Sequence, residues 1–205
     1  TGVYQPTSGK FFLDGEDLTG KSQQEINKKG IARTFQNIRL FNNMSVIRNV
    51  MVGLHNHDEF KCNPFVSMLR LPKHFKTETA MRNRAKELLR VFDLEEERNN
   101  LACNLPYGKQ RKLEITRALA TDPKLLLLDE PAAGMNPNET AELMETVKFI
   151  RDKFDMTILI IEHDLKFVSG LCDEVSVLNF GTVIAQGDTI EALNNPQVVE
   201  AYIGK

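Results

Sequence analysis

Short runs of apolar residues, each bounded by turn signals, predict the strands of a sheet. The runs lie at residues 10–13, 31–35, 125–128, 157–161, 175–178 and 182–185. We expect the strand at 125–128 to be buried on both faces and the one at 157–161 to be buried as well. The last two runs flank Phe180 and Gly181, which predicts a terminal hairpin.

Apolar residues spaced three and four apart predict helices between these strands. The expected buried faces are Val46, Ile47, Val50, Met51 and Leu54; Met81, Ala85, Leu88 and Phe92; Leu143, Val147, Ile150 and Phe154; and Leu165, Val168 and Leu171. Ser22 to Glu25 form a capping-box pattern whose helix should end at Gly30, and Ser45 is expected to cap the helix that follows it. Residues 136–139 supply a cap, a proline and an acidic residue in order, and two short helices should end the chain.

The order of these elements predicts two kinds of structure. Strand–helix–strand alternation over 125–179 favours a parallel α/β sheet, whereas 41–104 carries only helical signals and reads as a lobe inserted between two strands. Within the lobe, 55–77 is polar and irregular and contains His55, His57 and His74. Because these histidines lack a tight ligand spacing, we interpret the stretch as a solvated loop rather than a metal site.

Composition narrows the class of protein. The chain has 205 residues, of which 41% are hydrophobic, and a formal net charge of −2, which fits one core or one core plus a lobe. Nothing in the charge balance indicates nucleic acid as a partner, and no apolar run approaches the ~20 residues that span a bilayer. Cys62, Cys103 and Cys172 form no CxxC pair, so neither zinc nor a disulfide framework is indicated. A reducing cytoplasm is the simplest setting, and no signal peptide is visible.

Two carboxylates follow the apolar run at 125–128. Asp129 and Glu130 end this strand, and Pro131 comes directly after them. In open α/β sheets, ligands bind beyond the carboxyl ends of the strands, so this pair is placed to meet a substrate. A core strand that ends in an acidic loop is the alternative, and the remaining motifs decide between the two.

The stretch around this strand resembles a segment of the ABC-type ATPases. Residues 105–119 read LPYGKQRKLEITRAL and lead into the Leu-rich strand with Asp129 and Glu130, as the signature leads into the Walker B motif of that family. Gln36 resembles the Q-loop glutamine, residues 133–136 the D-loop, and His163 the switch histidine. The resemblance implies a P-loop NTPase-like core, a mainly parallel α/β sheet flanked by helices, at 1–40 and 121–205. It also implies an inserted helical subdomain at 41–120 that carries the signature.

The resemblance also implies chemical roles, and the residue types suit them. Asp129 is expected to bind Mg²⁺, and Glu130 to act as general base for the attacking water. Gln36 would contact the metal and this water, and His163 would contact the γ-phosphate of ATP. For His163 and Gln36 the plain alternative is a polar residue at a strand end.

The signature residues imply a second subunit. Gly108 should lie at the start of a helix, where free N–H groups attract a phosphate, and in the family that ATP is held by the opposite subunit of a homo- or heterodimer. We therefore assign Leu105, Pro106, Tyr107, Gly108 and Lys109 to binding ATP there. The D-loop residue assigned with them is Asn136. Pro106, Tyr107 and Lys109 depart from the usual serine, small residue and glutamine, and a solvated helix start is the alternative reading.

One family motif is missing from the 205 residues: no G-x-x-x-x-G-K-[ST] occurs. In the family this phosphate-binding loop lies just upstream of a segment like 1–9, so we expect the chain to begin in mid-domain at Thr1, without the first strands and this loop. As given, it is expected to bind ATP poorly.

Other stretches indicate which ABC ATPase the chain resembles. Residues 34–41, 105–109, 131–137 and the ending at 195–204 resemble the ATP-binding subunits of branched-chain amino-acid importers. The resemblance implies integral membrane permease subunits as partners and a peripheral position on the cytoplasmic face of the inner membrane. Alternatives are the lipopolysaccharide-export ATPase, a soluble ABC-type ATPase that acts on ribosomes or DNA, and a non-hydrolysing interaction module.

Overall fold

A computed structural model describes residues 1–55, 57–60 and 72–203 of the chain. Its elements, in chain order, are β1 (Phe12–Leu13), β2 (Glu16–Asp17), α1 (Gln23–Lys28), β3 (Ile31–Arg33), α2 (Val46–Leu54), the 3-10 turn η1 (Asp58–Phe60), α4 (Pro72–Val91), the 3-10 turn η2 (Ala102–Asn104), α5 (Tyr107–Leu119), β4 (Leu125–Asp129), α6 (Pro137–Phe154), β5 (Thr157–Ile161), α7 (Leu165–Leu171), β6 (Glu174–Asn179), β7 (Thr182–Asp188), α8 (Thr189–Leu193) and α9 (Pro196–Ile203). Within this part of the chain, no helix is long and apolar enough to cross a membrane.

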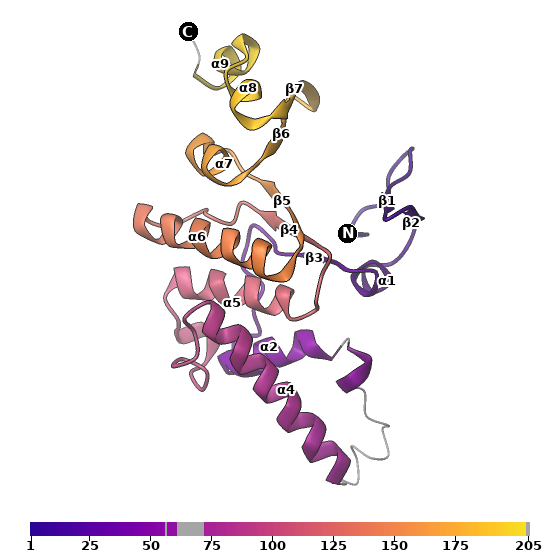
Figure 1. The fold of residues 1–205 in the computed structure, drawn as a ribbon, viewed down its shortest axis with the longest axis vertical. Helices are drawn as coiled ribbons and strands as arrows, with labels where there is room; N and C mark the ends of the chain where they lie inside the picture. The colour runs from indigo at the N-terminus through magenta and orange to yellow at the C-terminus, as the bar shows by residue number, and fades with distance from the viewer. Residues whose placement is uncertain (56, 61–71, 204–205) are drawn as a thin grey trace.

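A parallel sheet in the order β3-β4-β5 forms the centre of the fold, as the strand–helix alternation predicts. The helices α2, α4 and α5 come between β3 and β4 in the chain. Figure 1 shows these three helices grouped at one end of the molecule, the β6–β7 hairpin with α8 and α9 at the other, and the sheet between them. The hairpin turns at Phe180 and Gly181, both with positive φ, which confirms the predicted turn.

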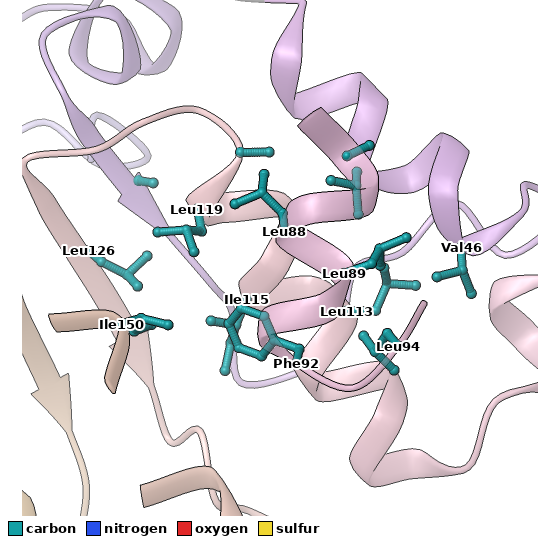
Figure 2. Close-up of a cluster of buried hydrophobic side chains, with 14 of the residues drawn as sticks. Val46, Leu88, Leu89, Phe92, Leu94, Leu113, Ile115, Leu119, Leu126 and Ile150 are labelled. Carbon is teal, nitrogen blue, oxygen red and sulfur yellow. The ribbon is translucent and has the colours of Figure 1, made fainter. Parts of the chain in front are cut away.

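The main core runs without a break from the sheet into the helices. Leu126 of β4 lies beside Ile150 of α6 and Ile115 of α5, and the same cluster continues through Leu88 of α4 to Val46 of α2 (Figure 2). Every member of the predicted face at 81–92 is buried, as is the face of α2 apart from the half-buried Met51. Burial of these apolar faces supplies most of the driving force for joining helices to sheet.

The burial of the strands differs from the prediction in two places. In β4, Leu126 and Leu128 are buried in the main core, whereas Leu125 and Leu127 on the opposite face are only half-buried. The opposite face packs on a second cluster that is too small to cover it, with three buried residues: Leu18, Ile26 and Ile31. Strand β5 forms over Thr157–Ile161 as predicted, but the prediction that it is buried is wrong. Leu159 and Ile161 are 55% and 57% exposed, because their face of the edge strand is uncovered in the described structure.

The helix starts also differ in detail from their sequence signals. The capping boxes at Ser22 and Asn136 are both formed, as predicted. Ser45 occupies the cap position of α2, but its side chain makes no capping hydrogen bond. The first N–H groups of the helix, those of Val46 and Ile47, donate instead to the carbonyls of Asn100 and Arg98. Helix α4 begins at Pro72, inside the stretch predicted to be irregular, and His74 falls within it.

Candidate functional site

Asp129 and Glu130 lie where β4 ends, at the carboxyl edge of the parallel sheet. The Asp129 side chain is 20% exposed, and its Oδ2 accepts a hydrogen bond from Nη2 of Arg33 at 2.7 Å. Glu130 has φ +44°, a left-handed conformation that is uncommon outside glycine. Its N–H donates to the carbonyl of Ile161 in β5, so the turn is fixed to the neighbouring strand.

Two more of the predicted site residues meet at Glu130. Gln36, three residues beyond β3, donates from Nε2 to Oε2 of Glu130 at 2.7 Å. His163, two residues beyond β5, places Nδ1 3.9 Å from Oε1 of the same carboxylate and 3.8 Å from Oε2 of Glu162, and 73% of its side chain is exposed. Since the ends of parallel strands meet at one edge, residues 127 positions apart in sequence converge on one carboxylate. The Glu130 carboxylate, which can accept a proton from water, is therefore flanked by the Gln36 amide and the His163 imidazole.

Two residues of this edge carry no sequence signal of their own. Glu162 has a side chain only 2% exposed, and it accepts hydrogen bonds from the N–H groups of Ala132 and His163. It thereby ties the loop after β4 to the end of β5. Arg33 has none because its contact with Asp129 spans 96 residues and depends on the β3–β4 pairing.

The predicted signature segment begins helix α5. Pro106 is the N-cap residue without a side-chain capping bond, Tyr107 is the first helical residue, and Gly108 follows it, so the predicted helix start is confirmed. Nζ of Lys109 forms an ion pair with Glu97, which balances part of the charge expected to attract a phosphate. Leu105 is buried just before the helix.

Gly108 and Asn136 are linked through the start of α6. A Cβ on Gly108 would lie 2.6 Å from Oε1 of Glu139, so only glycine fits there without displacing that side chain. Glu139 in turn accepts from the N–H of Asn136, whose side-chain oxygen caps α6. Asn136 therefore has a structural role at the start of α6, and its contact with ATP stays a prediction. The Tyr107 ring lies against Gly134, where an added Cβ would be 3.1 Å from it.

The side chains at this edge fit a magnesium–nucleotide complex. No group of three or more His, Cys, Asp or Glu in the described residues forms a complete metal cluster. Mg²⁺ in nucleotide sites uses only one or two carboxylates and takes its other ligands from phosphates and water. Asp129 is the carboxylate that such an ion would use, and its Oδ2 is bonded here to the Arg33 guanidinium, so a cation would take its place or bind through Oδ1.

A cavity of about 620 Å³ opens next to Gln36, between β3, α2 and α5. Three arginines and one glutamate contribute to its walls, which makes its charge positive: Arg33, Arg39, Arg117 and Glu114. The guanidinium of Arg39 stacks on the Phe35 ring at 4.0 Å, and that of Arg117 lies 5.4 Å from the Phe41 ring centroid. Burial lowers the pKa of Arg117, although nearby Glu114 opposes the shift.

A parallel α/β sheet with two carboxylates, an amide and an imidazole at its carboxyl edge fits the class of P-loop NTPase-like hydrolases. The ABC transporter family pattern matches residues 1–133. LivG of Escherichia coli K12, a high-affinity branched-chain amino acid transport ATP-binding protein, is 43% identical over all 205 residues, which cover 80% of LivG. BraF of Pseudomonas aeruginosa, described in the same words, is 40% identical with the same coverage.

Solved structures agree with these sequence relatives. A crystal structure of an ATP-binding cassette of an ABC transporter, in its ADP conformation, superposes with a TM-score of 0.81 and 32% identity. The match covers all of this chain and 80% of that one. The chain belongs to the ABC transporter ATP-binding family, whose members are ATP hydrolases.

Proposed function

We propose that this chain is the ATP-hydrolysing subunit of an ABC importer for branched-chain amino acids. The observation that carries the hydrolase assignment is the convergence of Gln36 and His163 on Glu130, beside Asp129. The transported substrate is assigned from LivG and BraF, both described as branched-chain amino acid transport proteins. As a subunit of such a transporter, the chain would lie peripherally on the cytoplasmic face of the inner membrane.

In this proposal the residues at the sheet edge divide metal binding, water activation and phosphate binding among them. MgATP supplies the phosphoanhydride bond that is cleaved and the cation that offsets its negative charge. Asp129 would hold the cation, and the amide oxygen of Gln36 would be a second ligand. Glu130 accepts the proton of the attacking water, which Gln36 orients, and His163 donates toward the γ-phosphate.

The signature segment would complete the site of a second subunit. Residues 105–109 lie at the start of the 13-residue helix α5, where free N–H groups and the helix dipole favour a phosphate. We assign these residues and Asn136 to the ATP of the opposite subunit, which makes the working unit a dimer. In this scheme 41–120 is the helical subdomain, and 1–40 with 121–205 is the catalytic core.

We assign the cavity beside Gln36 to the permease partner. It lies between the sheet and the helices, is lined by Phe35 and Phe41, and carries a positive charge. A cytoplasmic helix of the permease with one apolar face and an acidic residue would complement it. Arg39→Glu is expected to weaken permease binding while Arg90→Glu, on the exposed end of α4, leaves it unchanged. Equal binding of both variants would contradict the assignment.

Uptake by intact cells tests the proposed substrate. Deletion of the gene should abolish high-affinity uptake of labelled leucine, isoleucine and valine, and the encoded protein should restore it. If uptake of all three is unchanged by the deletion, the importer assignment is wrong, and a loss of lipopolysaccharide at the cell surface would point to export instead.

The 205 residues contain no G-x-x-x-x-G-K-[ST] loop, so we expect residues 1–205 alone to bind ATP weakly. Titration of a fluorescent ATP analogue measures this affinity directly. Submillimolar binding would show that the residues described above hold the nucleotide without such a loop.

A further inference from the structure

Helix α5 carries a buried ion pair that is unnecessary for a stable core. Nη1 of Arg111 lies 2.9 Å from Oε2 of Glu114, and the two side chains are 0% and 1% exposed. Apolar residues in place of a buried ion pair often leave a protein equally or more stable. Nε of Arg111 is also buried without a hydrogen-bond partner among the described residues, an additional penalty. Stability alone therefore does not account for this pair.

The pair holds the backbone of the segment that contains Gln36. Arg111 donates from Nη1 to the carbonyl of Phe35 and from Nη2 to the carbonyl of Gln36, each at 2.6 Å. Glu114 accepts from the N–H of Arg39 at 2.9 Å through its other carboxylate oxygen. Three backbone groups within five residues are thus bonded to side chains of α5.

The same arginine faces the first turn of α5. The Tyr107 hydroxyl lies 3.4 Å from Nη2 of Arg111, and the Tyr107 ring packs on Gly134 in the loop after β4. Gly134 has φ +77°, so a side chain there would be strained as well as crowded. The guanidinium therefore bonds to the segment after β3 and to Tyr107 at the start of α5, and the Tyr107 ring in turn contacts the loop after β4.

We propose that Arg111 is a positioning residue of the hydrolysis site: paired with Glu114, it fixes the 35–39 backbone to α5, so that the Gln36 amide meets Glu130. The inference rests on the proposed function for the roles of Gln36 and Glu130. Its consequence is that α5, which begins with the signature, and the Gln36 segment move as one unit. An arginine is needed because its planar fork reaches two carbonyls at once, which a lysine ammonium on a single stem does not.

The test removes both members of the pair together. Arg111→Met alone would leave the Glu114 carboxylate buried without its partner and is expected to unfold the protein. The double variant Arg111→Met/Glu114→Met removes both charges at similar volume and should stay folded. Lys112→Met is the matched control, because Lys112 is the next residue of α5 and pairs with the exposed Glu142.

Amide hydrogen exchange of the chain, measured without nucleotide, reports how firmly the 35–39 backbone is held to α5. In the double variant, the Arg39 amide and its neighbours at 36–40 should exchange roughly tenfold faster, since one backbone hydrogen bond to a charged group is lost. Exchange in α6 should be unchanged, as should all exchange in the Lys112→Met control. Unchanged exchange at 36–40, or an equal increase throughout α6, would overturn the proposal.

Kinetics separates positioning from a merely structural role. In the encoded protein with its permease, the double variant should lower kcat for ATP hydrolysis by about 100-fold and raise KM by a much smaller factor, because Gln36 orients the attacking water and is only one of the ligands of the MgATP cation. Arg111→Lys, which keeps the buried charge, should recover part of this loss and serves as the second variant if the double variant does not fold. A kcat equal to that of Lys112→Met would overturn the positioning role. Absence of hydrolysis in the wild type would instead contradict the proposed function, and the exchange data would still decide whether the segment is fixed by Arg111.

Discussion

Gly108 offers a test that separates folding from phosphate binding, and Gly108→Ala is the perturbation. Alanine is favoured over glycine in a helix by roughly 0.5–1 kcal/mol. The new Cβ would lie 2.6 Å from Oε1 and 3.0 Å from Cδ of Glu139, so that side chain must move. Its displacement removes the bond that Glu139 accepts from Asn136, at a cost of about 0.5–2 kcal/mol on the scale of capping interactions.

The two effects nearly cancel, so the free energy of unfolding should change by no more than about 1.5 kcal/mol. Urea denaturation followed by far-ultraviolet circular dichroism measures it on residues 1–205. ATP hydrolysis by the encoded protein should nevertheless fall by about 100-fold, because the methyl group keeps the α5 backbone from the phosphate of the opposite subunit. The double variant Gly108→Ala/Glu139→Ala, which relieves the crowding, should not restore hydrolysis.

Two results would refute this reasoning. A loss of stability above about 3 kcal/mol would show that Glu139 cannot move and that Gly108 is a packing residue. Normal stability combined with normal hydrolysis would show that the backbone at Gly108 does not approach a phosphate.

Three further predictions concern the rest of the fold. Gly53→Ala would place a Cβ 2.5 Å from a backbone oxygen of α5 and should lower the free energy of unfolding, measured by urea denaturation, by about 1–3 kcal/mol. An unchanged free energy of unfolding would mean that α2 and α5 can move apart without loss of stability. Arg33→Met removes the 2.7 Å ion pair with Asp129, whose two side chains are partly exposed, and should lower the free energy of unfolding by only about 1 kcal/mol. A loss above about 3 kcal/mol would show that the pair is not weakened by solvent as its exposure implies. Two hydrogen bonds hold the pKa of Glu25 below the ordinary 4.5: the larger effect comes from the Ser22 hydroxyl and the smaller from the Ser22 backbone N–H. The capping box therefore stabilises the fold above pH 4.5, and this contribution is lost as the pH falls through the lowered pKa. Ser22→Ala should therefore make stability less dependent on pH below 4.5, and an unchanged pH profile would contradict the role of the cap.

The features that the sequence predicts correctly are those set by neighbouring residues. The capping boxes at Ser22 and Asn136 depend on residues three positions apart, and both are formed. The apolar run at 125–128 is followed at once by Asp129 and Glu130, so a strand with carboxylates at its end needs no knowledge of the tertiary structure. The spacing of apolar residues in α4 and α6 likewise identifies their buried faces.

The features that the sequence leaves open depend on contacts between distant residues. Exposure of Leu159 and Ile161 is decided by what covers β5, and an apolar run contains no information about that. Arg33 and Arg111 look like ordinary surface cations in the sequence, yet one bonds to a carboxylate 96 residues away and the other to carbonyls 75 and 76 residues away. Such partners are defined only once the sheet and α5 are assembled.

The central claim is that Glu130 is the base of an ATP hydrolase, and one rate comparison tests it most directly. ATP hydrolysis by the encoded protein with its permease should fall by about 10²- to 10⁴-fold in Glu130→Gln, because a general base contributes acceleration of this order. Glu145→Gln, which changes a 76% exposed carboxylate on α6, should hydrolyse ATP at the wild-type rate. Equal rates for wild type and Glu130→Gln would contradict the account.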